Sequence, residues 1–594
     1  MSYLAKNACA AKAPTFQVDS TPPTIPEEAR RDWFILVLIF LLTLAYLRLF
    51  FNYTVINSDE GFVLEGAQRI LGGEMPHRDF FSFFAPGSYY WMALFFRLFG
   101  SSIGVGRAVL LGEGGLFSVL TYLLARRVCS RPSALLAVYF VTLTCLPFRF
   151  SVLHNWDSTL WACLALYAAL RSLERPRAAW ALATGAFTAF TCLCEQSKGG
   201  GLVLGLSAGF LILAWISRRA QEAAPSAAPP RLDKEGPGVV DLSATTPAPA
   251  STRRGALFMA AGFSTPFLLT FLYYGLHQGL PQLLADWLWP IRHYHAVAKT
   301  PFGYQMLSSA TLHAIYSGSP PSILLAWLLT GPWYVIPVLP ILAALGLGHW
   351  SAKAWQENSV RGRNGYYVLT TATLAGLLLA TLAAGRPDFT HLVYQSPLFF
   401  LVLAWIADGR DIPWRWLKAV KPVLVFLLFL SFTAFAMTLL WPSLHADHKL
   451  ETRRGTLRAN SADDALEYLG AHVSAGETIL VYPYMPLYYY LTATRSPGRY
   501  EYMMPGFNTP SQYEEFAAEL AADRTRVVLF ELSYRQKLVD MAAFPSITPA
   551  VLAARDPVEN YITTHYRACA SLTSQQFWRF TFMVRKDLPC PDRK

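Results

Sequence analysis

Long apolar runs recur along most of this chain, and they constrain its fold more than any other feature. A helix that crosses a membrane needs about 20 mainly apolar residues, and eleven segments between residues 33 and 441 approach that length. Of the 594 residues, 53% are hydrophobic and 15% are charged, which is too apolar a balance for a soluble protein of this size. The sequence therefore predicts a mainly α-helical, polytopic membrane protein.

The eleven predicted spans differ in strength, and the fourth has the weakest apolar signal. They lie near residues 33–51, 104–125, 133–148, 158–170, 178–194, 199–216, 255–275, 322–348, 365–384, 390–407 and 420–441. Segment 86–100 is apolar and aromatic but too short to cross. We expect it to form a helix that lies in the membrane interface or packs against the bundle.

Basic residues are concentrated in alternate loops between these spans. Clusters occur at 126–131, 171–177 and 218–219, whereas the opposite short loops hold single basic residues such as Arg149 and Lys198. The positive-inside rule then places the N-terminus in the cytoplasm and the C-terminal part outside. The formal net charge of +11 does not indicate nucleic-acid binding, because the basic residues do not gather on one face with exposed aromatics.

Composition divides the chain into three expected parts. Residues 1–32 form a short cytoplasmic tail, residues 33–441 form the transmembrane bundle, and residues 442–594 form a small outer α/β domain with alternating helix-like and strand-like segments. Within the bundle, residues 217–254 are rich in Pro, Ala and Ser and predict a disordered cytoplasmic linker.

Cysteine usage predicts no metal framework. The eight cysteines are scattered without paired metal-ligand spacing. No cofactor is expected, and a divalent cation is left open without being indicated. Cys569 and Cys590 alone fall in the polar C-terminal part, where an oxidising compartment would allow a disulfide; whether they pair is left open.

Two adjacent carboxylates, Asp59 and Glu60, directly follow the first span in the stretch NSDEGFVLEGAQ. Such a pair in a loop is usually a solvated surface feature, but here further features follow it in a fixed order. They are Gly73 to Pro76, Asp79, Pro86 with Tyr89, Tyr90 and Trp91, Leu98 to Gly100, and Arg107. This run resembles the first outer loop of the glycosyltransferase C superfamily, especially the bacterial relatives of protein O-mannosyltransferases and of lipid A aminoarabinose transferases.

The resemblance covers roughly the first 130 residues and implies an enzyme. It implies an inverting glycosyltransferase of the bacterial cytoplasmic (inner) membrane that moves a sugar from a polyprenyl phosphate to an acceptor hydroxyl at the outer face. Asp59 would be the general base, and Glu60 would bind or orient substrate. The sugar stays open, as does the acceptor, which could be a lipid, a glycan or a protein. The aminoarabinose transferases carry a lysine where this chain has Ala85, so phosphate contacts must come from elsewhere.

Ionisable residues at the outer ends of the predicted spans are the candidates for substrate binding. Such groups are costly at a membrane boundary unless they are paired or have a function. Arg386 or His391 could bind the phosphate or sugar, or could instead cap helix ends and pair with Asp388. Asp79 could be a turn or N-cap residue, and Lys198 a snorkelling lysine. The substrate-binding candidates are Arg78, Asp79, His154, Asp157, Lys198, Arg386 and His391.

The rival function is a transporter of polyprenyl-linked sugars or lipids without catalysis. Transporters place polar groups near the middle of the membrane between repeated halves. In this chain, the distinctive polar residues cluster at one predicted membrane face. The expected partners are therefore a polyprenyl-phosphate sugar, an acceptor and membrane lipids.

Overall fold

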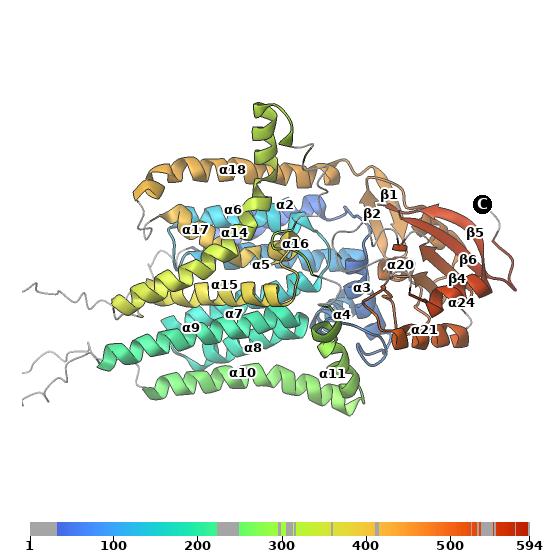
Figure 1. Ribbon diagram of the computed structural model, residues 1–594, viewed down its shortest axis with the longest axis horizontal. Helices are drawn as coiled ribbons and strands as arrows, with labels where there is room; N and C mark the ends of the chain where they lie inside the picture. Colours follow the sequence, from blue (N-terminus) through green and yellow to red (C-terminus); the bar gives the residue numbers. More distant parts are fainter. Residues whose placement is uncertain are drawn as a thin grey trace, which may run out of the picture.

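The computed structural model describes residues 32–222, 249–294, 299–304, 316–357, 362–409, 415–523, 525–531, 534–535, 554–575 and 578–591, with single positions at 313, 360 and 551. Long helices run along the longest dimension of the molecule, and a strand-containing part packs against one end of them (Figure 1). The predicted tail, apart from Asp32, and most of the predicted linker lie outside the described residues.

The long helices coincide with the predicted spans. They are α2 (Trp33–Leu47), α5 (Ile103–Ala125), α6 (Arg131–Phe148), α7 (His154–Glu174), α8 (Ala178–Cys194), α9 (Gln196–Glu222), α10 (Pro249–Leu276), α14 (Pro320–Gln356), α15 (Arg363–Ala383), α17 (Ser396–Asp408) and α18 (Arg415–Leu444). Eight helices in the described part are long and apolar enough to cross a membrane, and α8 and α17 are shorter apolar helices. The predicted helical, multi-pass membrane architecture is confirmed.

Two predicted boundaries are wrong. Residues 217–222 and 249–254 were expected in a disordered linker, but they continue α9 and begin α10. The sequence SRRAQE at the end of α9 is rich in residues with good helix propensity, so the helix extends past its apolar part.

The tenth predicted span, 390–407, is two helices, α16 (Phe389–Tyr394) and α17. Pro397 lies in the first turn of α17, where its missing N–H is tolerated. If α16 and α17 were one continuous helix, the Pro397 ring would clash with the carbonyl of the residue four positions earlier. The break therefore falls just before this proline.

The first outer loop contains two helices, α3 (Ser58–Leu71) and α4 (Gly87–Phe99). The 13 residues of α4 extend about 20 Å, and Met92 and Phe96 are buried. This agrees with the predicted packed helix at 86–100. A further short helix, α11 (Leu280–Trp289), follows α10.

The C-terminal part combines a hairpin, β1 (His448–Thr452) and β2 (Gly455–Ala459), with a four-stranded sheet. The sheet order is β3 (Ile479–Tyr482), β4 (Val527–Glu531), β6 (Arg579–Arg585) and β5 (Tyr566–Thr573), with β3 parallel to β4 and the other pairs antiparallel. Among the described residues of this part, four helices accompany the strands: α19 (Asp464–His472), α20 (Pro486–Thr492), α21 (Pro510–Asp523) and α24 (Pro557–His565). The predicted α/β character is confirmed, and Cys569 is bonded to Cys590.

The strand-containing part contacts the end of the bundle where the first outer loop lies (Figure 1). The Thr54 N–H donates to the Arg458 carbonyl, and the Ile103 N–H donates to the Arg454 carbonyl, each at 2.9 Å. Buried residues of α3 and of α20 belong to one hydrophobic core. As a result, α3 is held between the bundle and the C-terminal part.

The predicted basic loops lie together at other helix ends. Arg131 pairs with Asp32 at 2.7 Å, and Arg127 pairs with Glu174 at 2.6 Å. These residues lie at the start of α2, the end of α7 and the turn between α5 and α6. The opposite ends of these same helices approach the first outer loop, as alternating passes require.

Candidate active site

Asp59 and Glu60 occupy the first turn of α3. The Asn57 side chain caps this helix by accepting a hydrogen bond from the Glu60 N–H at 3.1 Å, and acidic side chains are favoured at this position by the helix dipole. The side chain of Asp59 is 43% exposed, whereas that of Glu60 is 1% exposed. The two neighbouring carboxylates therefore meet very different surroundings.

The Glu60 carboxylate is buried and hydrogen-bonded. One carboxylate oxygen accepts a hydrogen bond from Arg107 Nη2 at 2.8 Å, and the other accepts the Val152 N–H at 3.0 Å. Burial raises the pKa of Glu60 above its ordinary value, although Arg107 acts in the opposite direction. Arg107 also donates to the Phe150 carbonyl. Glu60 thus joins α3 to α5 and to the segment before α7.

Asp59 forms an ion pair with Arg149, which directly follows α6. Arg149 also interacts with the Tyr394 hydroxyl of α16, and its carbonyl accepts a hydrogen bond from the Trp156 indole at 3.2 Å. Arg149 and Tyr394 were not among the predicted site residues. The signal for Arg149 was its position as a lone basic residue between two apolar runs on the predicted outer side.

Lys198 is a buried, fully engaged cation, with 2% of its surface exposed. Its Nζ atom pairs with Glu195 at 2.9 Å and donates to the Asn155 carbonyl at 2.8 Å. It also donates to the hydroxyls of Ser158 and Thr159 at 2.7 and 2.9 Å. These contacts do not fit a snorkelling lysine, whose charged head reaches water.

Glu195 is a third site residue that was not predicted from the sequence, although it lies three positions before Lys198. Burial alone would raise its pKa, but the Lys198 ammonium and the His154 ring outweigh that effect and hold the pKa below its ordinary value. Asn155 donates to the Glu195 carboxylate at 3.2 Å. The signal that could have found it is an acidic residue in a short turn between two apolar helices.

Three predicted residues meet around one small polar cavity. Its volume is about 20 Å³, enough for about one water molecule. The wall contains Lys198, Arg386 and His391 together with Asn155, Glu195, Ser197, Thr381, Ala384, Tyr394 and Gln395. The cavity therefore gathers basic residues from α9, α16 and the segment before α16.

His154 lies at the edge of the same group. Its ring interacts electrostatically with Glu195, Lys198, Asp59 and His391. It also packs on the Phe84 ring with a centroid separation of 3.9 Å. His154 therefore lies near both Asp59 and the residues around the cavity.

Asp388 organises the basic residues beside the cavity. Its carboxylate accepts hydrogen bonds from Arg386 Nε at 3.0 Å and from Thr300 at 3.2 Å, and it contacts His391 Nδ1 at 2.9 Å. It also caps α16 through the His391 N–H. Although burial acts in the opposite direction, His391 and Arg386 hold the Asp388 pKa well below its ordinary value. Arg386 and His391 therefore pair with Asp388, as one of the two alternatives predicted. They also line the cavity, and their binding of phosphate or sugar stays a prediction.

Arg78 and Asp79 lie away from this group. They pair with each other at 2.6 Å, and the Asp79 carbonyl accepts a hydrogen bond from Arg69 at 3.4 Å. Arg69 is ten residues beyond Asp59 on α3, and a helix rises about 1.5 Å per residue, so about 15 Å of helix separates the two. Arg78 and Asp79 are therefore near the far end of α3.

Asp157 also has other neighbours. Its buried carboxyl contacts Glu113 of α5 and Ser88 of α4, and Trp91 donates to Glu113 at 3.0 Å. Asp157 is not part of the cavity wall. It belongs instead to a polar contact between α4, α5 and α7.

The C-terminal part covers α3 near Asp59. A Cβ atom on Gly61 would lie 2.1 Å from the Leu487 backbone nitrogen of α20, so the two helices touch backbone to backbone. Phe62 packs on Tyr502 at a centroid distance of 5.4 Å, and Tyr484 is close enough to interact electrostatically with Asp59. The site is therefore bounded by the bundle, the first loop and the C-terminal part.

This arrangement suits proton abstraction beside an anionic group. A partly exposed carboxylate can accept a proton from a hydroxyl, while Arg149, Arg386 and His391 offer donors to a phosphate. Among the described residues, no group of three or more His, Cys, Asp or Glu side chains is placed to hold a metal ion.

This chain is similar to known structures and, over part of its length, to a known family. The crystal structure of ArnT from Cupriavidus metallidurans bound to undecaprenyl phosphate is similar, with a TM-score of 0.44 and 13% identity over 94% of this chain and 99% of ArnT. Its apo structure has a TM-score of 0.45 and 12% identity over 95% of this chain and 100% of ArnT. No curated protein matches significantly. Residues 84–225 match the family described as dolichyl-phosphate-mannose-protein mannosyltransferase, which confirms the resemblance over that range.

Proposed function

We propose that this protein is a membrane glycosyltransferase that moves a sugar from a polyprenyl phosphate to an acceptor hydroxyl, with Asp59 as its base. The observation that carries the proposal is the ion pair between partly exposed Asp59 and Arg149, next to the cavity formed by Lys198, Arg386 and His391. The family match over residues 84–225 supports it, since that range contains Arg149 and Lys198.

The proposed step is a single displacement. Asp59 takes the proton of the acceptor hydroxyl as the oxygen attacks the anomeric carbon of the donor sugar. The bond between that carbon and the phosphate oxygen breaks, and its electron pair leaves with the polyprenyl phosphate. Attack from the side opposite the leaving group inverts the anomeric centre. A positioned base contributes about 10²–10⁴ to such a rate.

Arg149 has two roles in this proposal. In the absence of substrate it pairs with Asp59, and with donor bound it stabilises the charge that develops on the leaving phosphate. Arg386 and His391, which line the cavity together with Tyr394, assist Arg149 in this role. Lys198 and Glu60 are positioning residues, because their own contacts already satisfy them.

The proposed location is the inner membrane of a bacterium, with the N-terminus in the cytoplasm and the site at the outer surface. The predicted basic loops lie at helix ends away from Asp59 and would face the cytoplasm. The bond between Cys569 and Cys590 fits an oxidising periplasm around the C-terminal domain. Because α18 continues to Leu444, that domain would begin after residue 444.

The test is to incubate the purified protein with a panel of polyprenyl-phosphate sugars and an acceptor extract, and to measure release of polyprenyl phosphate. The expected result is release from one class of donor, with the sugar recovered on the acceptor. The same protein in sealed vesicles is the second arm. Movement of intact donor across the vesicle membrane without release would instead establish the transporter.

A further inference from the structure

A buried carboxyl group lies where the first outer loop meets the C-terminal part. Glu65 is in the middle of α3, and 3% of its surface is exposed. Its Oε2 atom is buried and has no hydrogen-bond partner among the described residues. A charge in such a place is costly unless it is paired and hydrogen-bonded. The surroundings of Glu65 therefore favour the neutral, protonated carboxyl.

The C-terminal part covers α3 on the face that carries Glu65. Gly61 lies one helical turn before Glu65 and so on the same face, and a Cβ atom there would be 2.1 Å from the Leu487 backbone nitrogen of α20. A Cβ atom on Gly66 would be 2.5 Å from the Tyr89 ring of α4. Buried residues of α3 and α20 also share one hydrophobic core. This packing keeps water away from the Glu65 carboxyl.

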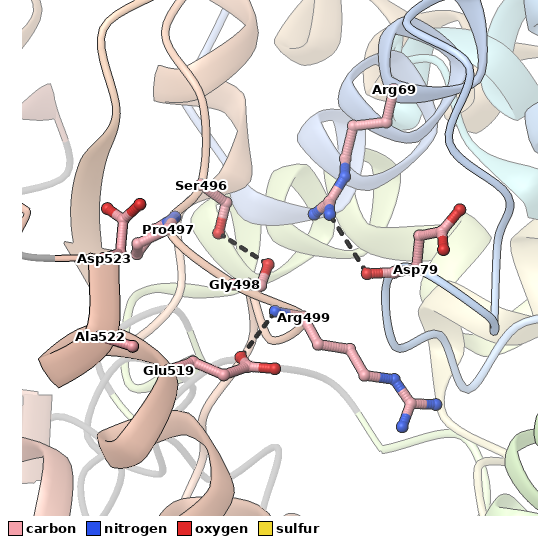
Figure 2. A pocket seen from close by; sticks show the side chains of 9 residues that line it. All are labelled: Arg69, Asp79, Ser496, Pro497, Gly498, Arg499, Glu519, Ala522 and Asp523. Carbon is pink, nitrogen blue, oxygen red and sulfur yellow. Dashed lines mark hydrogen bonds between the residues drawn. The ribbon is translucent and has the colours of Figure 1, made fainter.

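The guanidinium group one turn after Glu65 is engaged by two other carboxylates. Arg69 pairs with Glu501 of the C-terminal part at 2.7 Å and with Glu74 at 2.6 Å. It also donates to the Asp79 carbonyl at 3.4 Å (Figure 2). Arg69 therefore joins α3 to the C-terminal part through Glu501, and these contacts are made with groups other than Glu65.

A second guanidinium group acts on Glu65 from the turn between β1 and β2. Arg454 donates to the backbone carbonyls of Tyr490 at 3.3 Å and of Ser101 at 3.4 Å. If Glu65 is ionised, three carboxylates share the positive charges of Arg69 and Arg454, whereas protonation of Glu65 balances the charges. The charged or titratable groups that face Glu65 are Arg69, Glu74, Arg454, Glu501, Tyr489 and Tyr490.

The three carboxyl groups differ in how well their ionised forms are stabilised. Burial and the Glu501 carboxylate raise the pKa of Glu65 well above its ordinary value of 4.5, although Arg69 and Arg454 act in the opposite direction. Burial raises the pKa of Glu501 as well, but its direct ion pair with Arg69 favours the ionised form. The Glu74 side chain is 41% exposed, so water stabilises its charge. Glu65 has neither advantage.

We propose that Glu65 carries a proton while the C-terminal part is packed on α3, and that release of this proton at higher pH weakens the packing. An ionised Glu65 would need water or a cation beside it, and the covered face of α3 admits neither unless α20 moves away. Because α3 also presents Asp59 in its first turn, the pH would control how firmly the proposed reaction centre is covered. The proton-dependent packing itself does not depend on the proposed function.

Protonation of Glu65 makes the stability depend on pH in one direction. In the unfolded chain Glu65 titrates near its ordinary pKa of 4.5, whereas in the folded protein it keeps its proton to higher pH. Between these two pKa values the folded state binds more protons than the unfolded state, so the free energy of unfolding falls as the pH rises. Glutamine at this position has the shape of the protonated carboxyl and cannot ionise, so it removes this dependence.

The experiment compares the melting temperatures of the full-length native protein, Glu65→Gln and Glu65→Met in detergent at pH 5 and pH 8. Glu514→Gln in α21 is the matched control, because Glu514 is exposed. Hydrogen–deuterium exchange of the α20 amides, corrected for the intrinsic effect of pH, shows whether the change occurs at the contact with α3.

The expected result is that the melting temperature of Glu65→Gln relative to the native protein rises by about 2 °C or more from pH 5 to pH 8. Glu65→Met should show the same rise, whereas the relative melting temperature of Glu514→Gln should stay constant. The α20 amides should exchange faster in the native protein than in Glu65→Gln at pH 8 but not at pH 5.

The same pH dependence in the native protein and both Glu65 variants, or a relative melting temperature that falls from pH 5 to pH 8, would overturn the proposal. A rise in relative melting temperature without a difference in α20 exchange would also overturn it, because the effect would then lie elsewhere. Failure of both variants to fold at pH 5 would show that the fold requires the ionised carboxylate, which is the opposite of the proposal.

Discussion

At the scale of single residues, two adjacent carboxylates have opposite surroundings. Glu60 is buried against Arg107, whereas the Asp59 side chain is 43% exposed beside Arg149. A buried ion pair has lost its hydration, so removing one partner leaves an uncompensated charge. An exposed pair is screened by water and contributes little to stability. Glu60 is therefore expected to stabilise the fold, whereas Asp59 is expected to take part in the reaction.

The first prediction follows from this contrast. Glu60→Ala should lower the free energy of unfolding by about 3–5 kcal/mol, while Asp59→Asn should change it by less than about 1 kcal/mol. Denaturant unfolding in detergent, followed by tryptophan fluorescence, measures both. Equal destabilisation by the two substitutions would contradict this division of roles.

Arg149 gives the second prediction. If it holds the donor phosphate, Arg149→Gln should weaken binding of a polyprenyl-phosphate sugar by about 10- to 150-fold, as expected for a charged hydrogen bond of about 1.5–3 kcal/mol. Arg97→Gln is the control, because Arg97 is exposed on α4. Titration of donor into the detergent-solubilised variants measures the affinity, and an unchanged affinity in Arg149→Gln would remove Arg149 from the phosphate site.

At the scale of elements, α3 and α16 place the site residues. The N-terminus of α3 presents Asp59, and its packing on α20 depends on a glycine at position 61. The short helix α16 presents His391 and Tyr394 to the cavity, and Asp388 caps it. The placement of each helix thus depends on one residue, Gly61 for α3 and Asp388 for α16, that does not itself take part in the proposed reaction.

The third prediction concerns the contact between α3 and α20. In Gly61→Ala the new Cβ would meet backbone atoms of Leu487, which cannot move as a side chain could, so overpacking should cost about 1–3 kcal/mol. Gly112→Ala in α5 is the control, because a Cβ there meets nothing within 4 Å. Thermal melting should separate the two variants, and a neutral Gly61→Ala would show that α20 does not press on α3.

The fourth prediction concerns α16 and pH. The Asp388 pKa is lowered below its ordinary value of 3.8, so its stabilising effect is fully present above about pH 4 and is lost as the pH falls through the folded-state pKa. Asp388→Asn should therefore lower stability by about 1.5–3 kcal/mol at neutral pH. Unfolding of both proteins between pH 3 and pH 7 should show this difference shrinking only below pH 4. A difference that grows on acidification would contradict the assigned contacts.

At the scale of the whole molecule, the site forms where three parts of the chain meet. The bundle supplies Arg149 and Lys198, the first outer loop supplies Asp59, and the C-terminal part covers α3. A hollow lined by Arg69, Asp79 and Arg499 among others lies at the other end of α3 (Figure 2).

Sequence patterns predicted the helical bundle well, because each span carries its own apolar signal. They also predicted the mixed helix and strand character of residues 442–594, because strands β3, β4 and β6 have continuous apolar runs. They did not show the hairpin of β1 and β2, which has a weak alternating pattern. The contacts of Arg149 with Asp59 and Tyr394 join residues 90 and 245 positions from Arg149, and no local pattern carries such pairings.

The measurement that tests the account most directly is the single-turnover rate of sugar transfer by the native protein and by Asp59→Asn, with the protein in excess over a polyprenyl-phosphate sugar. The account predicts that Asp59→Asn keeps its melting temperature and its donor affinity but transfers about 10²–10⁴ times more slowly. Transfer at the native rate by a folded Asp59→Asn protein would contradict the central claim that Asp59 is the base.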